Sequence, residues 1–231
     1  MKSHFISKTL CIFTLGLLFS FQNILSGQTP DQLVSLKQQA AEWVGKNEKL
    51  SQVMVDKIFS FSELGFQEER SSKYLTDLLK KEGFDIEYGV SGIPTAWFAK
   101  WSQGEGPVIA LGSDVDCIPK ASQYPGVAYH KPIVEGAPGH GEGHNAGIPL
   151  NITAALSVQK IMKKEGIGGT LILWPGIAEE LVAAKAWYTR DGLFKDIDLC
   201  IFTHVSSNMG VSWGQSSGTG LISVAYTFEG E

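Results

Sequence analysis

The chain has 231 residues, of which 43% are hydrophobic and 19% charged, and its formal net charge is −5. A chain of this length and composition can bury a substantial core, so we expect a globular protein of one or two domains. The negative charge and the absence of any Lys/Arg run argue against nucleic acid or an anionic membrane as a partner.

The N-terminus has the pattern of a secretory signal peptide. A positively charged start, MKSHFISK, precedes the apolar run TLCIFTLGLLFSF and the polar stretch QNILSGQ. The apolar run is shorter than the roughly 20 residues of a membrane span, so a membrane anchor is the less favoured alternative. We therefore assign residues 1–27 to a signal peptide and expect an exported protein, periplasmic or extracellular, without membrane contact after cleavage.

After removal of residues 1–27, Cys117 and Cys200 are the remaining cysteines. Two cysteines in an exported domain can pair, but their spacing has no signature of a disulfide framework. We expect buried free thiols.

Three amphipathic helices follow the signal segment. Apolar residues recur at helical spacing in 29–47 and 48–64. The third segment, 67–83, has acidic residues in its first turn, lysines in its last turn and Gly83 as a stop, which is the charge order that the helix dipole favours.

Short runs rich in β-branched and aromatic residues then alternate with helical stretches at 151–166 and 179–194. The runs are FDIEYGV (84–90), TAWFAKW (95–101), PVIALGSDVD (107–116), TLILWPG (170–176) and DLCIFTHV (198–205). This alternation predicts an α/β fold in which helices cover both faces of a mostly parallel, mixed sheet.

Polar side chains stand at the predicted carboxyl ends of three strands, where ligands bind in open α/β sheets. These residues are Asp114 and Asp116, Glu179 and Glu180, and Thr203 and His204. The segment GAPGHGEGHNAG (136–147) adds His140, Glu142 and His144 just before the helical stretch. Its glycines and Pro138 argue against a helix and favour a loop that lets neighbouring side chains reach one ion.

Imidazole and carboxylate groups together suit zinc, manganese, cobalt or iron, so this convergence predicts a metal site. Each residue also has a plainer interpretation. A strand-end Asp is often a turn or cap residue, a lone His is more often hydrogen-bonded than metal-bound, and Glu179–Glu180 could simply start a helix. The joint placement of these residues favours the metal site over an ordinary α/β domain.

Five motifs occur together in an order that resembles a known family. They are FSELGFQEERSSKYLTDLLKKEGFDIEYGVSGIPT, GSDVDCIP, GHGEGHN, PGIAEE and FTHV. Their order and spacing resemble the metal-dependent amidohydrolases and peptidases that include aminoacylases, auxin-conjugate hydrolases and a p-aminobenzoyl-glutamate hydrolase. The resemblance implies a zinc-exopeptidase-like catalytic domain at 28–216, the start of an inserted α+β lid and dimerisation domain at 217–231, and a homodimer.

By position, the resemblance implies that His144, Glu180 and His204 bind one or two divalent ions, zinc or manganese. Glu179 would be the general base, and Asp116 would lie beside the metal in a catalytic role. Asp114 falls where related peptidases have a ligand histidine. The implied reaction is hydrolysis of the amide of an N-acyl amino acid or a small peptide-like conjugate by a metal-activated water.

Two departures from the family pattern qualify this expectation. Glu142 stands where the family commonly has a cysteine; it can still bind or bridge metal, with a preference shifted toward manganese, or it can mark a site that has lost a metal. His140 has no role in the family pattern and is a candidate for the surroundings of the site. The chain also stops where the lid would supply a histidine, so we expect these 231 residues to be inactive alone. The alternative function is a non-catalytic metal- or ligand-binding relative.

Overall fold

The computed structural model describes residues 29–214, 222 and 224–230. The predicted signal peptide lies outside these residues, and the described part of 217–231 contains no helix or strand. The chain divides into two units, 1–41 and 42–231, and the first is described only as the N-terminal part of helix α2 (Pro30–Lys46). No helix in the described ranges is long and apolar enough to cross a membrane.

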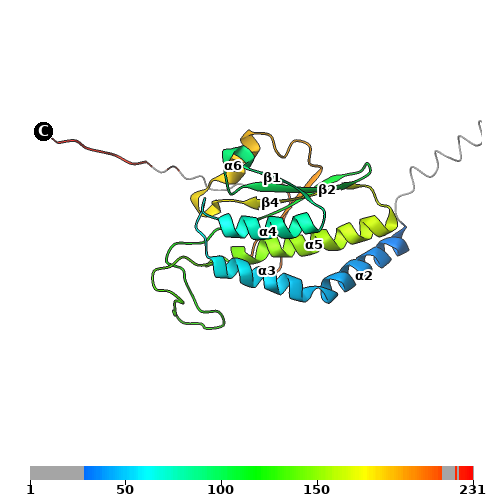
Figure 1. Cartoon of the computed structure of the whole chain (residues 1–231), viewed down its shortest axis with the longest axis horizontal. Helices are drawn as coiled ribbons and strands as arrows, with labels where there is room; N and C mark the ends of the chain where they lie inside the picture. Colours follow the sequence, from blue (N-terminus) through cyan, green and yellow to red (C-terminus); the bar gives the residue numbers. More distant parts are fainter. Residues whose placement is uncertain (1–28, 215–221, 223, 231) are drawn as a thin grey trace, which may run out of the picture. The chain divides into compact units, whose positions relative to one another are not determined.

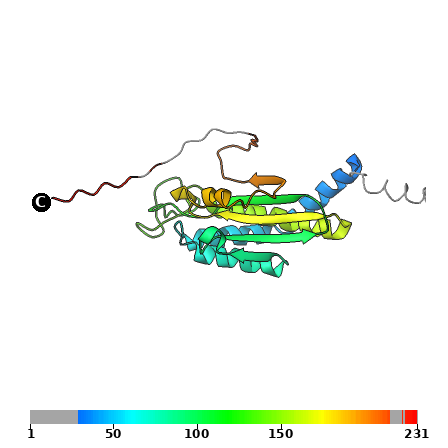
Figure 2. The ribbon, with the colours of Figure 1, turned by 90° about the horizontal axis from the view of Figure 1, so that it is seen from above.

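Five strands form one mixed sheet in the second unit. They are β1 (Asp85–Tyr88), β2 (Trp97–Gln103), β3 (Val108–Asp114), β4 (Gly169–Gly176) and β5 (Leu199–Phe202). Figure 2 shows the order β1-β2-β4-β3-β5, with β5 (orange) at one edge. β3 pairs in parallel with β4 and β5, whereas β2 runs antiparallel to β1 and β4. Only β2 therefore opposes the other strands, and the predicted fold class is confirmed.

Helices lie on both faces of this sheet (Figure 1). Helices α4 (Glu69–Lys81) and α5 (His144–Glu165) pack on one face, and α3 (Glu48–Phe61) packs against both of them. On the other face, Tyr188 of α6 (Ala184–Arg190) meets Trp174 and Phe98 edge-on, with ring centroids 6.0 and 5.5 Å apart. These aromatic contacts fix α6 over β2 and β4.

Two helical predictions need correction. α5 begins at His144 and not near Asn151, although Pro149 cannot donate a hydrogen bond to the carbonyl of Asn145. Gly147 lets the start of α5 pack closely against β3. A Cβ at this position would lie 1.8 Å from Ser113 Oγ. The predicted helix 179–194 is instead a 3₁₀ turn, η2 (Glu179–Leu181), followed by the short α6; Val182 breaks it by adopting a left-handed conformation, with φ of 54°.

Both cysteines are free, as expected, but only Cys117 is buried. Cys200 is exposed because β5 is an edge strand, all of whose residues are exposed. The expectation of a buried thiol was wrong at this position.

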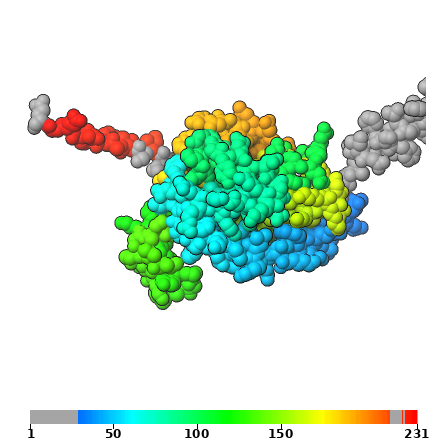
Figure 3. Space-filling model, viewed as in Figure 1, coloured from blue at the N-terminus to red at the C-terminus, as the bar shows by residue number. Residues whose placement is uncertain are grey.

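A long segment between β3 and α5 projects as a lobe (green in Figure 3). Its two ends are tied together by backbone hydrogen bonds of 3.0 and 3.1 Å between Ile118 and Gly139, and by a third from Ser122 to Ala137. The lobe therefore returns to its starting point, which brings the residues before α5 next to the carboxyl end of β3.

Candidate metal centre

Strands β4, β3 and β5 are parallel neighbours, so their carboxyl ends lie side by side at the same end of the sheet, as the sequence predicts. Asp114 ends β3, Glu179 and Glu180 follow β4, and His204 follows β5. His144 is the first residue of α5, and Glu142 precedes it at the end of the lobe. Residues far apart in sequence are thus brought to one place.

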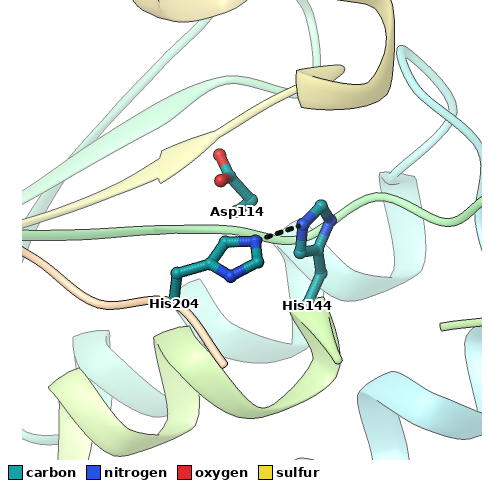
Figure 4. Close-up of side chains that lie close together, drawn as sticks. All are labelled: Asp114, His144 and His204. Atoms are coloured by element: carbon teal, nitrogen blue, oxygen red, sulfur yellow. Dashed lines mark hydrogen bonds between the residues drawn. The ribbon is translucent and has the colours of Figure 1, made fainter. Parts of the chain in front are cut away.

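Two histidines face each other at the centre of this site (Figure 4). His144 donates from Nδ1 to the backbone carbonyl of Asp116 at 3.0 Å, and His204 donates from Nδ1 to that of Val205 at 2.7 Å. Each Nε2 can therefore bind a metal when it carries no proton, and the two Nε2 atoms lie 3.2 Å apart, within hydrogen-bond distance (dashed line in Figure 4). Two imidazoles on one tetrahedral zinc, at bond lengths of about 2.0–2.1 Å, would place their nitrogens about 3.3 Å apart.

Carboxylates surround the histidine pair. Glu142 Oε2 lies 3.8 Å from His144 Nε2 and 3.7 Å from His204 Nε2, and Glu179 Oε2 lies 4.0 Å from His144 Nε2. Glu142, His144, Glu179 and Glu180 each offer a ligand atom within 4.8 Å of the others, and Asp114, His144 and His204 form a second such group. The two groups share His144, and each could hold a cation.

Asp116 contacts two of the candidate ligands, His144 and Glu180. It is buried, and its Oδ2 accepts the backbone N–H of Glu180 at 3.0 Å. Asp116 Oδ1 and Glu180 Oε1 are buried 3.5 and 3.9 Å from His144 Nδ1. Both carboxylates therefore place negative charge next to His144.

The pKa shifts of Glu180 and His144 also favour a site that binds a cation. Burial, followed by the charge of Glu142, raises the pKa of Glu180. Burial lowers the pKa of His144, but its hydrogen bond to Asp116 and the charges of Asp114 and Asp116 outweigh this effect, so the net pKa is raised. Negative charge is thus in excess at the site, and a divalent cation would neutralise it.

Comparison with known proteins shows which proteins this chain is similar to. No family model matches the chain. It is 33% identical over 158 residues to a p-aminobenzoyl-glutamate hydrolase chain of Escherichia coli, and the match covers 68% of this chain and 33% of that protein. This chain is related to the metal-dependent amidohydrolases and peptidases. It spans about a third of the length of this curated relative.

Solved structures agree at the level of the fold. The M20-family dinuclear metal-binding peptidase of Bacillus subtilis has a TM-score of 0.56 at 20% identity, over 71% of this chain and 45% of that one. The aminobenzoyl-glutamate utilization protein of Klebsiella pneumoniae has a TM-score of 0.57 at 14% identity, over 73% and 46%. The described residues thus share the fold of part of these two chains.

The sequence analysis missed Lys185, which lies between two acids of the candidate metal centre. Its Nζ lies 2.9 Å from Asp114 Oδ1 and 3.6 Å from Glu179 Oε1. Burial raises the pKa of Asp114 to about 6, although the charge of Lys185 opposes this. Lys185 is the second residue of α6. No motif marks it in the sequence, where it is a single lysine in the mainly apolar stretch after Glu180.

His140 lies in neither group of possible ligands. Its Nε2 donates to the backbone carbonyl of Ile58 at 3.1 Å, and its ring stacks on Phe59 at 6.3 Å between centroids. Burial lowers the pKa of His140 to about 4, so the ring is neutral. Its structural role is to attach the end of the lobe to α3.

Proposed function

We propose that this chain supplies the metal-binding residues of an amidohydrolase that cleaves N-acyl amino acids or small peptide-like conjugates. The observation that carries this proposal is the pair of Nε2 atoms 3.2 Å apart, with Glu142 within 3.8 Å of both and Glu179 4.0 Å from that of His144. The similarity to a p-aminobenzoyl-glutamate hydrolase makes p-aminobenzoyl-glutamate the first conjugate to test.

Glu142, His144, Glu180 and His204 would hold the metal. Because Glu142 provides a hard oxygen in the position where the family pattern has a soft thiolate, we propose manganese as the preferred ion, with zinc as the other candidate. A bound divalent ion supplies Lewis acidity, which makes water more acidic and an amide carbonyl more electrophilic.

Glu179 is the proposed general base. Lys185 lies beside its Oε1, so Oε2 is the oxygen that faces His144. Glu179 would take a proton from water as the water oxygen bonds to the amide carbon, and would return that proton to the nitrogen as the carbon–nitrogen bond breaks. Asp116 would hold His144 and Glu180 in place throughout, through its backbone oxygen and Oδ2.

Export and dimerisation are further parts of the proposal. The N-terminal charge and apolar run support a periplasmic or extracellular location, and the family resemblance supports a homodimer.

The experiment is metal analysis of the full-length protein purified without chelator, combined with assays of amino-acid release from N-acyl and p-aminobenzoyl conjugates. Glu179→Gln should lower turnover at least 100-fold and retain the wild-type metal content, because Glu179 moves the proton and the other residues hold the ion. Bound metal without turnover in the wild type would favour the binding relative. A wild type with no bound metal and no turnover would contradict the proposal.

A further inference from the structure

Glu68 is a buried carboxylate that the metal-binding residues do not explain. It is 0% exposed and lies just before helix α4. Burial raises its pKa, and no basic side chain in the described structure forms an ion pair with it. A buried carboxylate is unfavourable unless it is well hydrogen-bonded, so its partners should reveal its role.

Its two oxygens have different partners. Oε2 accepts the hydroxyl of Thr95 at 3.0 Å, and Thr95 is itself buried at the entrance to β2. Oε1 accepts the backbone N–H of Ala178 at 2.9 Å, across 110 residues of sequence. One oxygen therefore anchors the carboxylate, and the other binds the residue directly before Glu179.

Ala178 has an unusual backbone. Its φ and ψ are 51° and 45°, a left-handed conformation that residues other than glycine rarely adopt. Such strain persists when the surroundings hold the residue in place. Gly65 also packs on it, because a Cβ at Gly65 would lie 3.0 Å from Ala178 Cα. The segment 65–68 thus holds Ala178 by a close approach and by a hydrogen bond.

We propose that Glu68 is a positioning residue, which keeps Ala178 left-handed and so sets the direction in which Glu179 and Glu180 leave β4. The turn η2 has a second attachment, from Glu180 N–H to Asp116 Oδ2 at 3.0 Å. Without Glu68 the backbone N–H of Ala178 would lose its hydrogen bond to segment 65–68. The activity part of this inference rests on the proposed function, whereas the backbone part does not.

Three substitutions separate side-chain length from charge. Glu68→Gln keeps the length: its amide oxygen can accept from Ala178 N–H and its NH₂ can donate to Thr95. Glu68→Asp keeps the charge but is too short to reach both partners. Glu68→Leu removes both hydrogen bonds.

Glu63 provides a matched control in the same segment. Its carboxylate accepts the backbone N–H groups of Arg70 and Ser71 at 2.8 and 2.9 Å, so in the described structure its hydrogen bonds cap α4 and none goes to the turn. Glu63→Leu should therefore lower thermal stability without affecting Glu179 or Glu180.

The test uses the full-length protein and three measurements: hydrogen–deuterium exchange of peptides covering 177–184, Mn²⁺ affinity, and kcat and KM on the best conjugate. Glu68→Asp and Glu68→Leu should speed exchange in 177–184, weaken Mn²⁺ binding about 10-fold and lower kcat at least 10-fold with KM within about 3-fold. Glu68→Gln and Glu63→Leu should stay within about 3-fold of wild type in all of these.

A folded Glu68→Asp variant with wild-type exchange in 177–184 would overturn the inference, even if Glu68→Leu does not fold. Loss of metal affinity and kcat in Glu63→Leu to the same extent would also overturn it, because the effect would then be general. If the wild type neither binds Mn²⁺ nor turns over a conjugate, the proposed function fails, but the exchange measurement still decides the role of Glu68.

Discussion

Lys185 shows how single side chains tune this site. Its ammonium lies between a buried carboxylate, Asp114, and the proposed base, Glu179, and 4.8 Å from the centre of the Phe202 ring. Lys185 therefore already neutralises part of the charge on Asp114. Of the two groups of possible ligands, this favours Glu142, His144, Glu179 and Glu180 over the group that contains Asp114.

Lys185→Met should destabilise the protein by about 1–3 kcal/mol, because it leaves Asp114 buried without its charged partner. The double variant Lys185→Met/Asp114→Asn should recover more than half of that loss. Urea unfolding measures both. Lys160→Met is the control, since Lys160 pairs with Glu82 at 3.6 Å on the surface and should change stability by less than about 0.5 kcal/mol. No recovery in the double variant would contradict the pairing.

His140 should make the metal-free protein sensitive to acid. Its pKa is about 4 in the folded state, against an ordinary value of 6.5, because burial disfavours the charged ring. Below pH 6.5 the unfolded chain binds the proton more readily, so this contribution to stability is present above 6.5 and is lost as the pH falls toward 4.

The measurement is thermal unfolding of chelator-treated protein across that window. His140→Gln keeps a donor for the Ile58 carbonyl and should show a shallower fall in melting temperature between pH 6.5 and 4. His130→Gln, on the exposed lobe, is the control. An unchanged slope in His140→Gln would be evidence against a buried neutral ring.

The sequence could predict which residues meet, but not how each is held. Three carboxyl ends of parallel strands had to converge, so Asp114, Glu180 and His204 were predictable. Glu68 and Lys185 were not predictable, because their partners Ala178 and Asp114 lie 110 and 71 residues away in sequence and are brought close only by tertiary packing. The roles assigned to Glu142, His144, Glu179, Glu180, His204 and Asp116 stay predictions until tested.

At the scale of elements, the approach of α5 to β3 places His144. Gly147 allows that approach, and Asn151 Nδ2 donates to the carbonyl of Gly112 at 2.8 Å one turn further along. The strand ends could be predicted from the sequence. The first turns of α5 could not, because Gly147 and Pro149 both disfavour helices.

Gly147→Ala should therefore move the start of α5. The new methyl group would lie 1.8 Å from Ser113 Oγ, and the expected loss of stability is about 1–3 kcal/mol with weaker Mn²⁺ binding. Gly45→Ala in helix α2 is the matched control, because a Cβ there meets nothing within 4 Å and should be neutral or slightly stabilising. Equal stability changes in the two variants, measured by urea unfolding, would contradict this account of the packing.

At the scale of the whole molecule, the family and the α/β architecture were predictable, because the motif order and the strand–helix alternation are properties of the sequence alone. The predicted signal peptide lies outside the described residues, and export, the lid and the dimer stay predictions. The direction of β2 is set by pairing between β1 and β4, which no local pattern specifies.

The central claim is that the glycine-rich segment ending at His144 folds a carboxylate and an imidazole onto a metal. The most direct test is anomalous diffraction at the manganese edge from crystals of chelator-treated protein soaked in Mn²⁺. We predict a peak in contact with His144 Nε2, His204 Nε2 and a Glu142 oxygen, which disappears in His144→Ala crystals. An anomalous map without a peak at these atoms, from crystals in which Mn²⁺ is in excess, would contradict the claim.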